Sequence, residues 1–172
     1  MDYMIHMEKE FHLPRYVEIP NVGLYLKQVV KFSNDAVEPI LHTTVTETML
    51  SNYVKLHLVS NPVKKQYSRD QIADMIFIIL AKNALSLENV TVLLSMLGEH
   101  YTKQEAYDYF CERMETALRC VYANRDSAVS GDVDSGQEKA LLNNMIATIA
   151  NRCFLEDCFA VLKQRSADAD MN

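Results

Sequence analysis

Residues that interrupt helices are scarce in this sequence. Its 172 residues include only 4 glycines and 4 prolines. Because these two residues mark most turns, their scarcity excludes a loop-rich or fibrous chain and favours helices. Hydrophobic residues make up 49% of the chain, enough for one main core and a second small one. The composition therefore predicts an all-α protein with one domain and an appendage.

Signatures of catalysis and of metal binding are also missing. The sequence has no glycine-rich phosphate loop and no serine or cysteine elbow, and its 5 histidines lie in unrelated contexts. The cysteine spacing matches no common zinc site, so free, mostly buried thiols are expected at Cys111, Cys120, Cys153 and Cys158. We therefore expect a protein that is not an enzyme and that has no metal or cofactor.

No apolar run is long enough to cross a membrane. The longest, from Met75 to Ala81, has 7 residues, whereas a helix needs about 20 to span the hydrocarbon core. The first eight residues have neither the positive flank nor the apolar stretch of a signal peptide. We expect a cytoplasmic protein that makes no membrane contact.

Positive charge is in deficit overall but is unevenly distributed. The formal net charge is -6, whereas a nucleic-acid-binding protein usually shows a basic patch. Between residues 44 and 69, however, four basic residues accompany one acidic residue, while 98–172 has 8 basic against 13 acidic residues. This asymmetry would turn the first segment toward a polyanion, and it predicts a modest, salt-sensitive affinity.

The segment from Thr44 to Leu97 is expected to organise the rest of the chain. Thr44 and Glu47 have the spacing of a capping box, which predicts a short helix that ends near His57. One face of that helix is apolar and carries Met49, Leu50, Tyr53 and Val54. The opposite face carries side chains that can donate or accept hydrogen bonds, namely Glu47, Thr48, Ser51, Asn52 and Lys55.

A tight basic turn is predicted after this helix. Pro62 pushes the residue before it out of the helical region, which ends the helix and starts a turn. The residues 63–67 are enough only for a tight hairpin or wing, with Lys64 and Lys65 at its tip.

Two further helices follow the turn. Ser68 and Gln71 form a second capping box, which opens a helix that is apolar almost all round and therefore buried. Another short helix begins at Ser86. A polar helix, a basic turn and a buried helix in this order are typical of a winged helix-turn-helix.

Three stretches of this segment resemble regulators of the MerR family. Residues 50–62 (LSNYVKLHLVSNP) resemble the end of that family's recognition helix, 65–68 (KQYS) its wing, and 84–90 (ALSLENV) the start of its later helix. The longer stretch 13–97 is similar to a bacterial family of uncharacterised proteins predicted to carry a MerR-like DNA-binding domain. The resemblance implies a winged helix-turn-helix with a minimal β wing, which would bind double-stranded DNA and regulate transcription.

The sequence departs from the MerR pattern at three positions of the predicted recognition helix. Ser51 stands where those regulators have an arginine that contacts DNA, Asn52 where they have the first of two tyrosines, and His57 where they have glycine. Base reading and phosphate anchoring would therefore differ in detail from the MerR pattern.

Eight side chains are expected to contact DNA: Thr48, Ser51, Asn52, Tyr53, Lys55, Lys64, Lys65 and Arg69. Amide and hydroxyl groups on an outward helix can read base edges in the major groove, while lysines hold phosphates. Tyr53 is ambiguous, because its ring also fits the core. An ordinary solvated helix face is the other interpretation of the polar set, and a non-catalytic protein-interaction module on a winged-helix scaffold is the alternative function.

The flanking segments are expected to support this domain. We divide the chain into an N-terminal arm (1–12), the MerR-like domain (13–98) and a C-terminal antiparallel helical hairpin (99–172). Ahead of the recognition helix, Asn21 is expected to cap one helix, and Ser33 or Asn34 to start another. Both would act as scaffold.

The C-terminal hairpin is expected to begin after a break at residues 98–100. Thr102 and Glu105 form a third capping box, which opens a helix that reaches about Ala128. A turn-rich loop (127–136) and a final helix over about 137–164 complete the chain.

The same two helices carry more large apolar residues than they can hide on each other, and MerR-like regulators bind two half-sites as dimers. We therefore expect a homodimer held by Phe110, Met114, Leu118, Met145 and Ile149. A small-molecule effector, if the protein has one, would bind beside the same seam.

Overall fold

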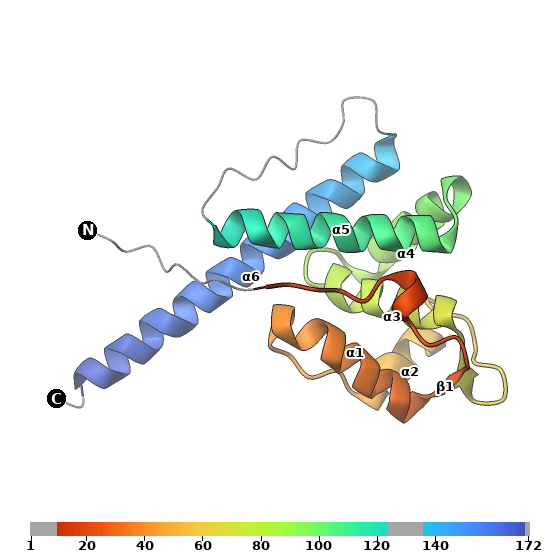
Figure 1. Ribbon diagram of the computed structural model, residues 1–172, viewed down its shortest axis with the longest axis horizontal. Helices are drawn as coiled ribbons and strands as arrows, with labels where there is room; N and C mark the ends of the chain where they lie inside the picture. The colour runs from red at the N-terminus through yellow and green to blue at the C-terminus, as the bar shows by residue number, and fades with distance from the viewer. Residues whose placement is uncertain (1–9, 124–135, 171–172) are drawn as a thin grey trace.

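The computed structural model describes residues 10–123 and 136–170 of the chain. These residues form a short 3-10 turn (η1, Tyr16–Glu18), two short strands (β1, Leu24–Tyr25; β2, Gln66–Tyr67) and six helices. The helices are α1 (Leu26–Leu41), α2 (Glu47–Lys55), α3 (Arg69–Ala81), α4 (Leu87–His100), α5 (Lys103–Tyr122) and α6 (Gln137–Asp170). The predicted helical class is confirmed, and Figure 1 shows that the C-terminal end of α6 projects away from the body.

Helix α3 lies at the centre of the core because its side chains are apolar on every side. All residues from Gln71 to Ala81 are buried except Asp74, which is half-buried. The helix packs against α1, α4, α5 and α6, as expected for a helix without a polar face. The predicted capping box is confirmed, since Ser68 Oγ accepts a hydrogen bond from Gln71 N (3.3 Å) and Gln71 Oε1 accepts one from Ser68 N (2.8 Å).

Helices α5 and α6 run side by side in the same direction, so the predicted antiparallel hairpin is wrong. Tyr101, just before α5, donates to Glu138 at the start of α6, whereas Tyr122 at the end of α5 donates to Asp157, far along α6. Figure 1 shows the same parallel course. The 14 residues between the two helices can span roughly 46 Å when extended, which exceeds the roughly 30 Å length of α5. The connection is therefore long enough for α6 to start beside the start of α5.

The segment before η1 is clamped onto α5 by charged hydrogen bonds. The guanidinium of Arg15 donates to both oxygens of Glu115 (2.7 and 2.9 Å), and Leu13 N also donates to that carboxylate (2.8 Å). Burial opposes ionisation of Glu115, but the bonds from Arg15 and Leu13 outweigh it, so the pKa of this carboxyl lies below its ordinary value. Phe11 and Leu13 are buried and are the first described residues of the core.

The predicted helices between residues 21 and 41 are wrong in two respects. Residues 24–25 form β1, which pairs with β2, so the helix begins only at Leu26 and Asn21 caps nothing. No second helix begins at Ser33 or Asn34, because α1 runs without interruption to Leu41. The amide of Asn34 instead binds the backbone of Val45, accepting from its N–H (2.6 Å) and donating to its carbonyl (3.0 Å).

This grip on Val45 also explains why α2 starts later than predicted. Val45 is buried and its backbone groups are bound by Asn34, so the chain stays extended through this residue. Thr46, not Thr44, is the N-cap, and its Oγ1 accepts a hydrogen bond from Met49 N (3.3 Å). The capping box predicted for Thr44 and Glu47 is therefore wrong, although the helix itself is present.

The later helices agree with the predicted starts better than with the predicted ends. Ser86 caps α4, and Thr102 with Glu105 forms the expected capping box of α5. Helix α4 continues through residues 98–100, so the predicted break there is wrong. Helix α5 ends at Tyr122, earlier than predicted, and α6 extends past 164 to Asp170. The loop predicted over 127–136 lies outside the described residues except for Gly136.

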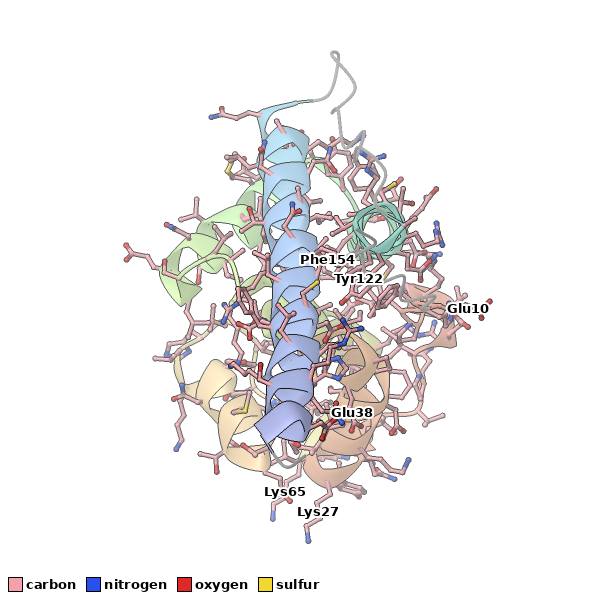
Figure 2. All side chains as sticks on the ribbon, turned by 90° about the vertical axis from the view of Figure 1, so that its left-hand side faces the viewer. Glu10, Lys27, Glu38, Lys65, Tyr122 and Phe154 are labelled. Carbon is pink, nitrogen blue, oxygen red and sulfur yellow. The ribbon has the colours of Figure 1, made fainter. Side chains whose placement is uncertain are left out.

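The carboxylate of Asp157 joins three helices where α6 leaves the body. Its Oδ2 accepts a hydrogen bond from the hydroxyl of Tyr122 (2.6 Å), and its Oδ1 lies 3.0 Å from Nε2 of His42, at the end of α1. One turn earlier, Phe154 packs edge-on against Tyr122, and Figure 2 labels the two residues close together. None of the described residues from Cys158 to Asp168 is buried.

Candidate functional site

Helix α2 presents its polar face to solvent because its apolar face is fixed in the core. Leu50 and Tyr53 are buried. On the opposite side, Thr48, Asn52 and Lys55 are exposed, whereas Ser51 is half-buried. Among the described residues, no side-chain hydrogen bond uses Thr48, Asn52 or Lys55, so their polar groups are available to a ligand.

Tyr53 belongs to the core and not to the accessible face. Its side chain is only 3% exposed, and its hydroxyl has no hydrogen-bond partner among the described residues. Burial raises the pKa of this phenol to about 12. The ring lies 5.9 Å from Lys82 Nζ. Tyr53 is therefore removed from the set of side chains that can touch DNA.

The turn after α2 places two adjacent lysines in an unusual backbone conformation. Val63 and Gln66 exchange backbone hydrogen bonds (3.1 and 2.9 Å), which leaves Lys64 and Lys65 as the two central residues of a tight turn. Their φ angles are 50° and 65°, the left-handed values of a type I′ turn, where Asn-Gly is the usual pair. Both lysine side chains are exposed. The predicted tight turn with a lysine tip is thus present.

Arg69 is used inside the molecule. Its Nε donates to the carbonyl of Ile19 (2.7 Å) and its Nη2 to that of Val17 (3.3 Å), while the guanidinium lies 5.3 Å from the ring centroid of Tyr16. These contacts fasten the η1 segment to the start of α3. The side chain is half-buried, so we withdraw it from the predicted phosphate contacts.

Lys27 joins the lysine turn at the same end of the molecule, which the sequence did not indicate. Tyr25 in β1 pairs with Gln66 in β2, which brings the start of α1 next to the turn. Figure 2 shows Lys27 and Lys65 projecting from this end, and Lys27 is exposed. We call Lys27, Lys64 and Lys65 the basic end. The sequence could not predict the position of Lys27, because strands of only two residues leave no recognisable alternation.

The connection from α2 to the basic end is held by a buried amide. Gln71 Nε2 donates to the carbonyls of Ser60 (2.8 Å) and Asn61 (3.1 Å). Just after α2, His57 adopts φ 58°. The path from the polar face of α2 to the basic end is therefore fixed by local backbone geometry and by α3.

The five side chains predicted for the dimer seam are buried inside one chain. Phe110, Met114, Leu118, Met145 and Ile149 are each at most 3% exposed. Phe110 also packs edge-on against Phe77 of α3, at 4.7 Å between ring centroids. These residues form the core between α3, α5 and α6, so an interface through them is excluded in this fold.

Several hollows between the described helices lie away from the basic end. A groove of about 410 Å³ between α4 and α6 is lined mainly by Leu85, Val92, Leu93, Met96, Leu141 and Met145. A smaller cavity of about 50 Å³ lies where α3, α4 and α5 meet, beside the ion pair of Asp74 and Lys103 (2.5 Å). A small-molecule effector beside the former seam remains a prediction.

Features of metal sites and of membrane spans are absent from the part of the chain that the structure describes. No group of three His, Cys, Asp or Glu residues there could hold a metal ion. No described helix is long and apolar enough to cross a membrane. None of the four cysteines is in a disulfide; Cys111 and Cys153 are buried, and Cys120 and Cys158 are half-buried. Burial raises the pKa of the Cys111 thiol to about 12.

A protein-family model for a domain of unknown function, DUF1836, matches residues 14–112, more than half of the chain. The chain belongs to the DUF1836 family. In this DUF1836 protein the matched region runs from before η1 to the middle of α5, and it includes α2 and the basic end. The match starts at residue 14 and continues past the predicted boundary at 98, and it assigns no function to the region. No curated protein and no solved structure matches the chain.

Proposed function

We propose that this DUF1836 protein is a transcription regulator that binds double-stranded DNA with α2 in the major groove and the basic end on the phosphates. The observation that carries the proposal is the exposed, hydrogen-bonding face of α2 beside a turn with two free lysines. No catalytic role is proposed.

The chemistry of the α2 face suits base reading. Asn52 can bind adenine with two hydrogen bonds, Thr48 can donate or accept one, and Lys55 can donate to guanine or to a phosphate. A helix fits the major groove when such side chains point outward and the opposite side is packed on a core. Leu50 provides that packing, since it is fully buried.

The lysine turn supports a contact with a polyanion. A left-handed conformation costs a non-glycine residue roughly 1–2 kcal/mol, and here two successive lysines adopt it. Among the described residues, their exposed side chains make no packing contact that would stabilise the fold, whereas on DNA they would place two cations at fixed positions beside the phosphates. Lys27 adds a third positive charge at the same end.

The backbone after α2 also fits the MerR resemblance. The residue at the position of that family's glycine is His57, and its φ of 58° is a value that glycine adopts without strain. The residue type at this position differs from the MerR pattern, but its backbone conformation is one that the glycine of that pattern could adopt. Ser51, at the position of the arginine, is only half-buried and can contribute a hydroxyl.

The decisive variant is Lys64→Asn/Lys65→Gly, which removes both charges while giving the turn its preferred residues. Binding to genomic fragments, including the protein's own promoter, is followed by fluorescence titration at several salt concentrations. We expect sequence-selective binding by the native chain, and a variant whose plot of log K against log salt is shallower by about 2. Loss of binding cannot then be attributed to an unfolded turn.

A matched control is Arg119→Glu, which makes the same change in net charge at an exposed position of α5. It should leave the salt slope unchanged. If the native chain binds no DNA even at low salt, where counterion release is most favourable, the proposal is wrong.

A protein-interaction module on the same scaffold is the second candidate. It is favoured by apolar side chains near the lysines, since Val22 is 79% and Val63 is 74% exposed. A pull-down that yields one protein partner, together with the absence of DNA binding, would favour this function. Val63→Ser should then lower the affinity for that protein partner more than Lys64→Gln does.

A further inference from the structure

The last turns of α6 carry an apolar stripe that the rest of the chain leaves uncovered. Leu155, Phe159 and Leu162 are 54%, 56% and 47% exposed. Their spacing of four and three residues puts them on one face of the helix. Phe154 lies on a different side of the helix, where its ring packs against Tyr122 (Figure 2). The outward orientation of the stripe is therefore set by the packing of its neighbour.

This part of α6 also lacks the usual support of a helix. None of its side chains described after Asp157, through Asp168, is buried, and this part of the helix projects from the body (Figure 1). Short helices without tertiary packing are marginal in water, because their stability comes mostly from a covered apolar face. A partner that covers the stripe would supply that stability.

The charges beside the stripe fit a second copy of the same helix. Glu156 and Lys163 are both exposed and lie on the same flank of the stripe, seven residues apart. When two helices pack antiparallel about a two-fold axis, equal flanks face each other. With the axis near Phe159, Glu156 lies beside Lys163 of the second copy, and Leu155 lies against Leu162 of the second copy. In a parallel pairing unlike flanks of the two helices face each other, so Glu156 and Lys163 would not meet across the interface.

We propose that the stripe formed by Leu155, Phe159 and Leu162 pairs this chain with a second copy of itself, antiparallel, about a two-fold axis near Phe159. The interface is different from the buried seam between α5 and α6. It does not depend on DNA binding. Because the stripe and β1 lie at opposite ends of the long axis in Figure 1, the paired chains would leave both basic ends free.

Sedimentation equilibrium without DNA tests the pairing. The native chain should be dimeric, and Leu155→Glu/Leu162→Glu should raise the dissociation constant by on the order of 100-fold or more. The matched control is Val17→Glu/Val22→Glu, since both valines are exposed elsewhere, and it should remain dimeric. A native chain that is monomeric throughout, or a stripe variant that dimerises like the native chain, overturns the proposal.

Charge exchange tests the antiparallel direction. Glu156→Lys and Lys163→Glu should each weaken the dimer, because each sets like charges against each other, and the double variant should restore it. Helix content from circular dichroism shows that the chains remain folded. Failure of the double variant to recover affinity overturns the antiparallel arrangement, and binding of the monomer to anionic lipid vesicles through the stripe overturns the second copy as its partner. DNA binding is measured separately, so its failure leaves this result intact.

Discussion

The basic end and the C-terminal end of α6 differ in the side chains that they expose and in the contacts that fix their backbones. At the basic end the side chains are polar and free, and the backbone is fixed by contacts from elsewhere, such as the amide of Gln71 and the strand pair. At the end of α6 the backbone is satisfied by its own helix, and the exposed side chains are apolar. The first end presents charged groups to solvent, whereas the second presents an apolar surface.

A pair of truncations should separate the ends most strongly. Leu50→Ala removes a fully buried side chain under α2, so we expect a loss of about 2–5 kcal/mol in the free energy of unfolding. Leu162→Ala removes an exposed one, and in the monomer it should change that free energy by less than about 0.5 kcal/mol. Urea denaturation at low protein concentration measures both. Equal losses would mean that the stripe is covered within one chain.

The clamp between Arg15 and Glu115 should give the next largest effect, and it depends on pH. Glu115 has a depressed pKa in the folded chain, so its contribution is present above its unfolded pKa of about 4.3 and is lost as pH falls through the folded value. Glu115→Gln should cost about 1–3 kcal/mol at neutral pH. It should also flatten the fall in stability below about pH 4.5.

The control for this clamp is Glu112→Gln on the exposed side of the same helix. Its unfolding free energy should follow the native chain at every pH. A Glu115→Gln protein whose acid unfolding matched that of the native chain would show that the clamp carries no stability.

The smallest effect should be a gain. Lys64→Asn/Lys65→Gly relieves two left-handed lysines, and we expect it to raise the free energy of unfolding by about 1 kcal/mol. Lys64→Gln/Lys65→Gln removes the same charges without relieving the backbone, so it should leave the stability nearly unchanged. Similar denaturation midpoints for both variants would show that the conformation of the turn is not strained.

Local signals in the sequence predicted the parts of the fold that depend on a few adjacent residues. The capping boxes at Ser68 and Thr102, and the buried character of α3, follow from short spacings and from a continuous apolar run. The two-lysine turn was predictable for the same reason, since Pro62 and five residues left room for little else.

Contacts between distant residues account for the misses. Asn34 binds Val45 and shifts the start of α2, which no local spacing reveals. The pairing of Tyr25 with Gln66 brought Lys27 to the candidate site. Apolar periodicity correctly predicted that the seam residues are shielded from solvent, but it could not distinguish a core within one chain from an interface between two chains. It also did not predict the direction of α6 relative to α5.

The carboxylate of Asp157 has a geometric consequence. It binds α1 through His42 and α5 through Tyr122 at the point where α6 leaves the body, so it sets the angle at which the helix departs. In a dimer built on the stripe, a small rotation at this pivot would be magnified along the helix into a change in the distance between the two basic ends. The spacing of the two half-sites on DNA that such a dimer could bind would then depend on the angle of α6 at Asp157.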